Sequence, residues 1–190
     1  MIVLNGASSS GKSSMARALQ DLWPRPLVVT GIDTYISGWP RSYLNYPGED
    51  GTPAAPSPGL RVVPGGAPAP SWLLEAGDEF HNLMRLAHRV WATFRDGGVD
   101  QVIDHALIDE EMRRDAIEVL AGAYWVGVFC DLEEMVRRES ARGDRPIGFA
   151  SGSSVVVHNE MIYDLTLDTT TTTSEENASL LYSAFNFIGG

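Results

Sequence analysis

The sequence predicts an α/β protein in which helices cover both faces of a parallel sheet. Three observations support this fold class. Five short, mostly apolar segments alternate along the chain with longer segments of helical periodicity. A glycine- and serine-rich stretch, Gly6–Ser13, joins the first apolar segment to the first helical one. The length of 190 residues suits one domain, 1–190, with a full core. Alternating strands and helices are typical of parallel sheets, whose strands are buried on both faces.

Five strands are predicted from the apolar segments. They are Ile2–Asn5, Leu27–Gly31, Gln101–Asp104, Tyr124–Cys130 and Tyr163–Leu167.

Five helices are predicted from the segments of 3.6-residue periodicity and their end signals. Pro24 and Pro26 stop the first helix near Trp23, and Gly97-Gly98 stops the second. Asp131 and Glu134 have the spacing of a capping box at the start of the fourth. The predicted helices are Ser14–Leu22, Trp72–Phe94, Glu110–Leu120, one that begins at Asp131, and Ser174–Phe185.

The segment from Trp39 to Pro70 differs from the rest, because it holds eight of the 11 prolines. Proline removes a backbone donor, so we predict neither regular helix nor central strand there. Long irregular insertions are usually functional loops, and the aromatic residues Trp39, Tyr43 and Tyr46 favour a loop packed over a site. A mobile surface excursion is the alternative interpretation.

The excess of acidic over basic residues argues against two classes of binding partner. There are 25 Asp and Glu against 14 Lys and Arg, a formal net charge of -11. Such a surface repels nucleic acid and anionic lipid, so neither is expected as a partner. The single cysteine, Cys130, excludes an internal disulfide and fits a reducing cytoplasm. We find no signal peptide and no apolar run long enough to span a membrane, and expect a cytoplasmic location.

The stretch between the first strand and the first helix fits the phosphate-binding P-loop pattern G-x-x-x-x-G-K-[ST]. Its glycines allow backbone N–H groups to point at phosphate oxygens, and the following helix, from Ser14, adds a positive dipole end. Lys12 would reach the β- and γ-phosphates, and the Ser13 hydroxyl would be a ligand of Mg²⁺. The predicted nucleotide-binding residues here are Gly6, Ala7, Ser8, Ser9, Ser10, Gly11, Lys12, Ser13 and Ser14.

Two carboxylates follow predicted strands and are candidates for chemistry beside this loop. Asp33 follows the second strand, at the sheet edge where the P-loop lies, and suits a base that orients and deprotonates an acceptor hydroxyl. A turn or cap aspartate is the alternative. Asp104 is the last residue of the third predicted strand. It resembles the Walker-B position of P-loop proteins, where an aspartate holds Mg²⁺ directly or through water. Its neighbour His105 is a weaker candidate for substrate contact, with a structural histidine as the alternative.

A run of arginines begins in the fourth helix, within a predicted lid region, 131–150. Arg138 and Arg142 are four residues apart, so they share a helix face, and Gly143 can end the helix. Guanidinium groups suit the dispersed negative charge of a transferring phosphoryl group. A solvated, charged helix end is the alternative interpretation.

Several motifs together resemble the chloramphenicol phosphotransferase family. The shared residues run in order along nearly the whole chain, and those from Trp125 onward are the most specific. They are Leu4-Asn5-Gly6, Ser8-Ser9, Gly11-Lys12-Ser13, Gly31-Ile32-Asp33, Ile103-Asp104, Trp125–Val128, Cys130-Asp131, Arg138-Glu139, Ala141–Arg145, Val156–His158, Tyr163-Asp164 and Asp168–Thr170.

The resemblance implies a three-layer P-loop kinase fold with strand order 2-3-1-4-5, and ATP-dependent phosphorylation of a hydroxyl on an antibiotic-like small molecule. It implies that Asp33 is the base and that Lys12 is the phosphate lysine. It also implies that Arg138 is the arginine before the lid and that Arg142 and Arg145 are lid arginines. The residues near the adenine would be Asp168, Thr169 and Thr170.

The sequence departs from the family around the acceptor. The family has a second aspartate where this chain has His105, and the segment 41–70 matches poorly, so reaction type transfers better than substrate identity. We expect Trp39, Tyr43, Asp104 and His105 to contact the acceptor. Two alternatives stay open: a metabolic kinase for a sugar, shikimate or a nucleoside, and a nucleotide-binding switch or toxin-like regulator. The oligomeric state, including a homo-oligomer, also stays open.

Overall fold

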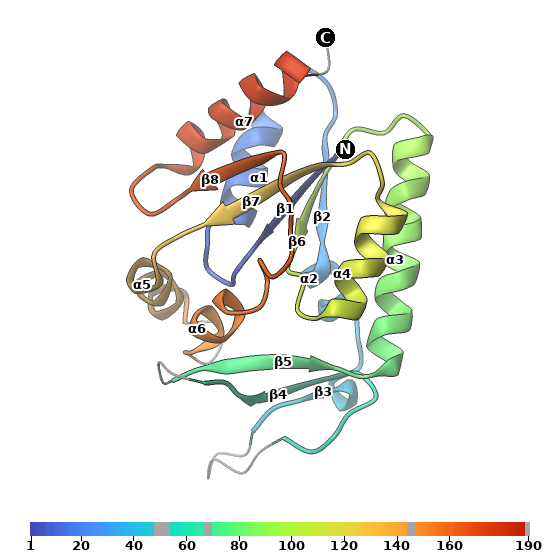
Figure 1. Cartoon of the computed structure of the whole chain (residues 1–190), viewed down its shortest axis with the longest axis vertical. Coiled ribbons are helices and arrows are strands. Elements are labelled where there is room, and N and C mark those ends of the chain that lie inside the picture. Colours follow the sequence, from blue (N-terminus) through green and yellow to red (C-terminus); the bar gives the residue numbers. More distant parts are fainter. Residues whose placement is uncertain (48–53, 67–69, 144–146, 189–190) are drawn as a thin grey trace.

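A five-stranded parallel sheet forms the centre of the molecule (Figure 1). The computed structural model describes residues 1–47, 54–66, 70–143 and 147–188. The strand order is β2-β6-β1-β7-β8, and every neighbouring pair is parallel. Counted within this sheet alone, it is the predicted order 2-3-1-4-5; the labels differ because β3 to β5 belong to a second sheet. The strands are β1 (Ile2–Gly6), β2 (Val28–Gly31), β6 (Gln101–His105), β7 (Tyr124–Phe129) and β8 (Leu165–Asp168).

Helices cover both faces of this sheet and complete the predicted three layers. On one face lie α1 (Lys12–Leu22) and α7 (Ser174–Ile188), and on the other α3 (Asp78–Asp96) and α4 (Glu110–Val119) (Figure 1). The alternation of β1 explains the two cores, because Ile2 and Leu4 face α1 whereas Val3 faces α3 and α4. All three are at most 1% exposed, as a central parallel strand requires.

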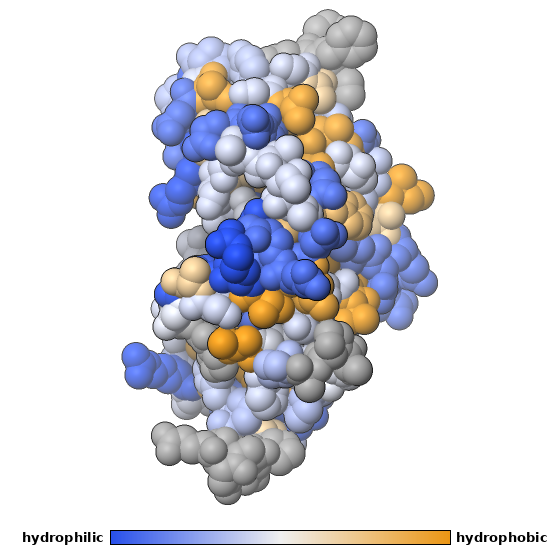
Figure 2. All heavy atoms as spheres, turned by 90° about the vertical axis from the view of Figure 1, so that its left-hand side faces the viewer, coloured by the Kyte–Doolittle hydropathy of each residue, from blue (hydrophilic) through white to orange (hydrophobic). Residues whose placement is uncertain are grey.

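Three short helices lie near the ends of the strands where the P-loop emerges. They are α2 (Ile32–Ser37), α5 (Leu132–Arg142) and α6 (Phe149–Ser154) (Figure 1). Figure 2 shows the side of the molecule that carries α5 and α7, where hydrophilic side chains gather across the middle, at the height of α5. The predicted capping box at Asp131 does not form, because Glu134 instead binds Arg137 and Arg138. Gly143 ends α5 with φ 63°, as predicted.

The proline-rich segment contains strands, which corrects the prediction of an irregular insertion. After a 3-10 turn (Arg41–Tyr43), β3 (Leu44–Asn45), β4 (Leu60–Pro64) and β5 (Trp72–Ala76) form a second sheet in which β4 is central. Leu60 and Val62 are buried while Arg61 and Val63 are not, a two-residue period that the prolines around it obscured. Pro64 is tolerated because it is the last residue of its strand.

The second predicted helix is also shorter at its start than expected. Residues Trp72–Ala76 pair antiparallel with Leu60–Pro64 instead of continuing α3, which begins at Asp78. The apolar positions of α3 are not all buried either, since Val90 is 43% and Phe94 40% exposed. No helix in the described ranges is both long enough and apolar enough to cross a bilayer.

Phe80 joins α3 to the inserted segment and gives a test of this packing. It is fully buried, with its ring 5.4 Å from that of Trp39. We expect Phe80→Ala to lower the free energy of unfolding by about 3–5 kcal/mol, because it removes an aromatic side chain from a packed core. Leu86→Ala, on the same helix but 60% exposed, should change it by no more than about 0.5 kcal/mol. Urea unfolding of both variants measures this; equal losses would contradict the assignment.

Candidate active site

The P-loop connects the buried strand β1 to α1. A Cβ on Gly6 would overlap the carbonyl oxygen of Val128, so only glycine fits where β1 leaves the sheet. Gly11 has φ 92°, a left-handed conformation that favours glycine, and it turns the chain into α1. The two glycines of the motif are therefore explained by backbone geometry.

Lys12, Ser13 and Asp104 meet at the mouth of this loop, as predicted from the strand ends. The Lys12 ammonium donates to the carbonyl oxygens of Gly6 at 2.9 Å and Ala7 at 2.8 Å, and lies 3.7 Å from Asp104 Oδ1. The Ser13 hydroxyl donates to Asp104 Oδ2 at 2.5 Å. Hydroxyl and carboxylate oxygens are ligands that Mg²⁺ accepts, so this pair is the candidate metal site.

A cleft, here called the phosphate cleft, opens in front of these residues and contains about 750 Å³ of space open to solvent. Its lining combines the P-loop with residues from α2, β5, α5 and α6. The lining residues are Ser8, Ser9, Lys12, Ser13, Ile32, Asp33, Ile36, Trp72, Leu73, Leu74, Asp104, Ala106, Ile108, Arg142, Phe149, Ser153 and Val156.

The P-loop carries polar atoms that the protein itself does not satisfy. The buried hydroxyl oxygens of Ser8, Ser9 and Ser10 have no hydrogen-bond partner within the described part of the chain. Buried polar groups nearly always have partners, so such a cluster points to a ligand. Together with the Lys12 charge, these groups fit the oxygens of a phosphate chain.

A second, apolar pocket of about 650 Å³ lies between α2 and the small sheet. Asp33 is the one charged residue among its lining residues in the described ranges, and it also lines the phosphate cleft. Asp33 therefore stands where the two spaces adjoin. The apolar pocket is lined by Asp33, Ile36, Leu44, Asn45, Tyr46, Leu60, Val62, Leu74 and Phe149.

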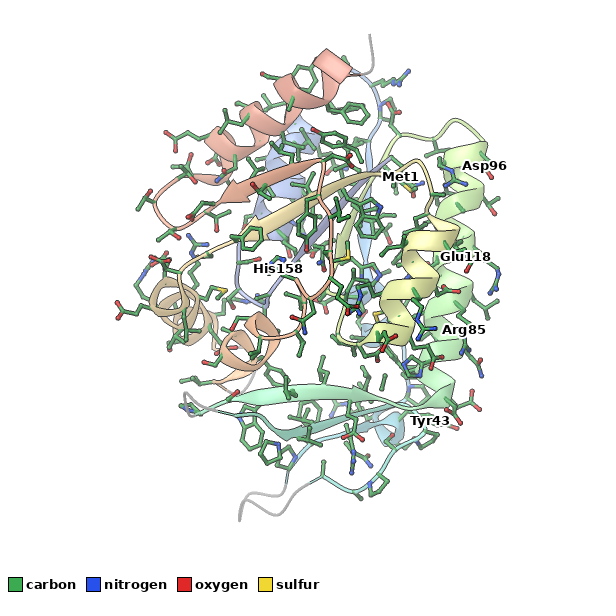
Figure 3. All side chains as sticks on the ribbon, viewed as in Figure 1. Met1, Tyr43, Arg85, Asp96, Glu118 and His158 are labelled. Carbon is green, nitrogen blue, oxygen red and sulfur yellow. The ribbon has the colours of Figure 1, made fainter. Side chains whose placement is uncertain are left out.

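The structure does not bring Trp39 and Tyr43 to either space, which corrects their predicted contact with the acceptor. Their rings lie 5.5 Å apart, and Trp39 packs on Phe80 in the core. Figure 3 shows Tyr43 beside the small sheet and the start of α3. Neither residue is among those that line the two spaces in the described ranges. Tyr46, also predicted from this segment, does line the apolar pocket.

His105 lies in the core and not in the cleft, so its predicted contact with substrate is also corrected. It is fully buried, and its Nδ1 accepts the backbone N–H of Ala106 at 2.9 Å. Its Nε2 lies 2.9 Å from Nε2 of His88, whose Nδ1 lies 2.5 Å from Asp115. Burial lowers the pKa of both histidines. In the neutral pair, the Nε2–H of His105 donates to Nε2 of His88, and the Nδ1–H of His88 donates to Asp115.

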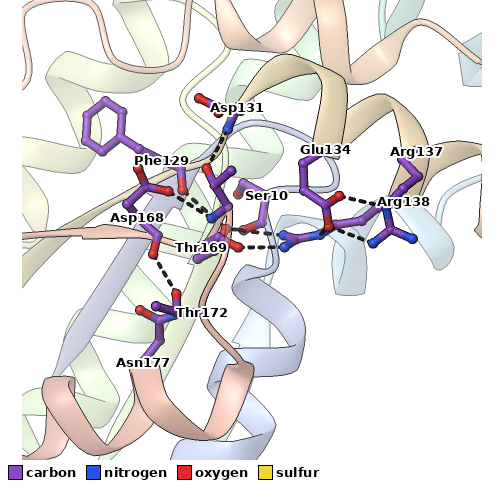
Figure 4. Close-up of polar contacts among 11 residues, drawn as sticks. Ser10, Phe129, Asp131, Glu134, Arg137, Arg138, Asp168, Thr169, Thr172 and Asn177 are labelled. Atoms are coloured by element: carbon purple, nitrogen blue, oxygen red, sulfur yellow. Dashed lines mark hydrogen bonds and ion pairs between the residues drawn. The ribbon is translucent and has the colours of Figure 1, made fainter.

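Arg138 binds the loop after β8 instead of facing the phosphate cleft (Figure 4). It donates to the Thr169 carbonyl at 2.6 Å and to Glu134 at 2.7 Å. Thr169 in turn donates from its hydroxyl to the Ser10 carbonyl at 2.7 Å. Hydrogen bonds from Arg137 and Arg138 lower the pKa of the Glu134 carboxyl to about 2. These contacts tie α5 to the P-loop through Thr169.

A third space, the threonine pocket, has a volume of about 600 Å³ on this side of the P-loop and includes Gly11, Ser14, Arg138 and Thr169. Of the three residues predicted near the adenine, Thr169 lines this pocket. Asp168 and Thr170 lie beside it in a turn, in which the Thr170 N–H donates to Asp168. Hydrogen bonding from the Thr170 side chain, and after it from its backbone N–H, lowers the pKa of the Asp168 carboxyl. Arg142 lines the phosphate cleft, so Arg138 and Arg142 line different spaces. Arg145 lies outside the described residues.

Sequence reasoning missed α6 and its contribution to the site. Phe149 lines both the phosphate cleft and the apolar pocket, and Ser153 lines the cleft. The segment carries no strong periodicity, and its helix has only 6 residues, so no pattern in the sequence marks it.

A buried polar group supports the P-loop from the β7 side. Asn5 donates to the Tyr163 hydroxyl at 2.7 Å, and that hydroxyl lies 2.7 Å from Nδ1 of His158. The His158 ring stacks on Phe129 with centroids 4.0 Å apart. Burial, and after it the charge of Lys12, lowers the pKa of His158 to about 4. His158 is therefore neutral in the folded protein at neutral pH.

Comparison with known proteins agrees with this geometry. A model of the chloramphenicol phosphotransferase-like protein family matches residues 1–186. A Mycobacterium tuberculosis H37Rv protein, named as a candidate O-phosphotransferase, is 32% identical over 190 residues, covering 97% of this chain and 81% of the relative.

The chain belongs to the chloramphenicol phosphotransferase-like family. The family places it among phosphotransferases that act on small molecules.

Solved structures show the same fold at low sequence identity. A sugar kinase from Janibacter sp. HTCC2649 has a TM-score of 0.61 and 16% identity, covering 97% of this chain and 93% of its own. The Mycobacterium tuberculosis APS kinase, solved with AMPPNP and APS, has a TM-score of 0.57 and 17% identity, covering 97% of each chain. These similarities confirm the P-loop kinase fold for this member of the chloramphenicol phosphotransferase-like family.

The lowered pKa of His158 predicts an acid dependence of stability. Its ordinary pKa is about 6.5, so below that pH the unfolded chain takes up a proton that the folded chain binds only near pH 4. The free energy of unfolding should fall as the pH decreases from 6.5 to 4. His158→Phe keeps the stacking and removes this titration, so the fall should be shallower. Urea unfolding at several pH values compares the two slopes; parallel slopes would contradict the assignment.

Proposed function

We propose that this protein transfers the γ-phosphoryl group of ATP to a hydroxyl of a small, partly apolar molecule bound in the apolar pocket. The observation that carries the proposal is the position of Asp33, which lines both the phosphate cleft and the apolar pocket. A carboxylate between a phosphate site and an acceptor site suits a general base for phosphoryl transfer.

The donor end of the reaction rests on the P-loop. Its backbone N–H groups and the three unsatisfied serine hydroxyls would bind the phosphate oxygens. Lys12 would exchange its bonds to the Gly6 and Ala7 carbonyls for the developing negative charge, and Arg142 would add a second cation. Ser13 and Asp104 are the residues that would hold Mg²⁺, which supplies positive charge to the phosphate oxygens.

The acceptor end is set by the apolar pocket. Among the described residues that line it there is no Lys, Arg or His, and the lone charge is Asp33. Such a pocket favours an uncharged or cationic alcohol with an apolar body over an anionic acceptor. This supports an antibiotic-like acceptor over a carboxylated metabolite such as shikimate.

A screen of candidate acceptors with γ-labelled ATP tests the proposal. We expect labelled product from hydroxyl-bearing antibiotics or related neutral alcohols, and none from carboxylated or phosphorylated alcohols. Lys12→Ala should abolish transfer while circular dichroism shows a folded protein, because the lysine meets the developing charge. Turnover by the folded variant near the wild-type rate would refute the assignment of the donor site.

Asp33→Asn tests the role of the base separately from nucleotide binding. We expect kcat to fall by about a hundredfold or more, the usual contribution of a positioned base, with little change in ATP affinity. Asp78→Asn, an exposed change in the first turn of α3, serves as the control. Loss of ATP binding without a fall in the rate of the bound complex would make Asp33 a structural residue.

A further inference from the structure

The short helix α6 contacts three parts of the active site at once. Its residue Ala150 belongs to a small, separate core formed with Ala7 of the P-loop, Met135 of α5 and Val157. Phe149 lines both the phosphate cleft and the apolar pocket. The helix thus lies between the donor and acceptor sides of the proposed reaction.

The contact between α6 and the P-loop is a hydrogen bond at the cleft. The Ser8 backbone N–H donates to the Ser153 hydroxyl at 2.9 Å, and that hydroxyl donates to the Phe149 carbonyl at 2.6 Å. Ser153 also lines the phosphate cleft beside Lys12. It therefore fixes the orientation of a P-loop peptide group, the kind of group that binds phosphate.

The contact between α6 and the small sheet is close packing of backbones. A Cβ on Gly152 would overlap the carbonyl group of Trp72, the first residue of β5. The Trp72 N–H also donates to the Gly148 carbonyl at 2.9 Å. Since Leu74 of the same strand lines the apolar pocket, a shift of α6 would move a wall of that pocket.

The contact between α6 and α5 is a buried carboxylate. Glu139 is 1% exposed and accepts the backbone N–H groups of Gly148 at 2.7 Å and Ala150 at 2.9 Å. Since α5 also carries Arg142, the same helix links an arginine of the cleft to the start of α6. All three connections are directional or tightly packed, so α6 cannot move independently of its neighbours.

We propose that α6 couples nucleotide binding at the P-loop to the acceptor-side sheet, with Ser153 as the positioning residue that carries the coupling. The inference rests on the proposed function, because it requires that the P-loop binds a nucleoside triphosphate. A ligand that engages the Ser8 N–H changes its bond to Ser153, and α6 transmits that change to β5. By reciprocity, an acceptor that shifts β5 changes nucleotide affinity by the same factor.

Hydrogen–deuterium exchange with the Mg²⁺ complex of a non-hydrolysable ATP analogue tests this without a known acceptor. In the wild-type protein we expect the analogue to slow exchange at Trp72–Ala76, beyond any effect of ADP. Ser153→Ala should abolish that protection and weaken binding of the analogue by about fivefold, as for one lost hydrogen bond. Because Trp72, Leu73 and Leu74 also line the phosphate cleft, protection by direct contact with the analogue would persist in this variant. Ser153→Thr, which keeps the hydroxyl, should restore both the protection and the binding.

Matched variants separate coupling from damage to the fold. Ser154→Ala removes a neighbouring hydroxyl that donates to the Ser151 carbonyl, and should behave as wild type. Gly152→Ala should abolish protection of β5 while the analogue still binds, whereas Gly66→Ala, with no atom within 4 Å of the added Cβ, should not. Circular dichroism checks that each variant is folded.

The outcomes distinguish this inference from the proposed function. If the wild-type protein does not bind the analogue, the proposed function fails and the coupling with it. If the analogue binds but β5 shows no protection, or if protection persists in folded Ser153→Ala, the coupling is refuted and the proposed function stands.

Discussion

The central position of β1 in the sheet is the constraint on which the site depends. Its parallel neighbours are β6 and β7, and Leu4 lies in register with both Asp104 and Val126. The P-loop therefore leaves the sheet beside the carboxylate that follows on β6, and the Lys12 ammonium lies 3.7 Å from it. Residues about 90 positions apart meet because parallel strands end at one edge. The charges of the cleft thus follow from strand order more than from local sequence.

The two sheets contribute different kinds of side chain to the site. The parallel sheet supplies Asp104 from β6, and the start of α1, which follows β1 through the P-loop, supplies Lys12 and Ser13. The small sheet supplies apolar walls from Leu60, Val62 and Leu74. The small sheet is an insertion between β2 and α3, so the residues that build it lie outside the strand–loop–helix unit that forms the P-loop. The poor family match that the sequence predicts for the segment 41–70 falls in this insertion and not in the P-loop.

The sequence predicts the parallel sheet and the geometry of the P-loop well, because the strands and the loop have local patterns. The P-loop spacing requires its glycines locally, and the strand ends place Asp33 and Asp104. The small sheet could not be predicted, since β5 is defined by its pairing with Leu60–Pro64 and its own residues also fit a helical period. The sequence predicts Trp39 at the site because it is an aromatic residue of the proline-rich segment, and His105 because it follows Asp104. Whether such residues face a cleft or the core depends on packing against Phe80 and His88, which no local pattern encodes.

The distribution of satisfied polar groups separates the scaffold of the site from its binding surface. Below the P-loop, Asn5 is fully buried and uses both sides of its amide, donating to the Val157 carbonyl at 2.6 Å and accepting the Leu107 N–H at 3.1 Å. Thr169 is likewise bonded to Ser10. In the loop itself, the hydroxyls of Ser8 and Ser9 have no partner in the described chain. The groups below the loop have all their hydrogen-bond partners and therefore resist rearrangement. The serine hydroxyls of the loop lack partners and would be stabilised by a bound anion. The groups below the loop are therefore held in place before any ligand binds, whereas the Ser8 and Ser9 hydroxyls would gain their partners from the ligand.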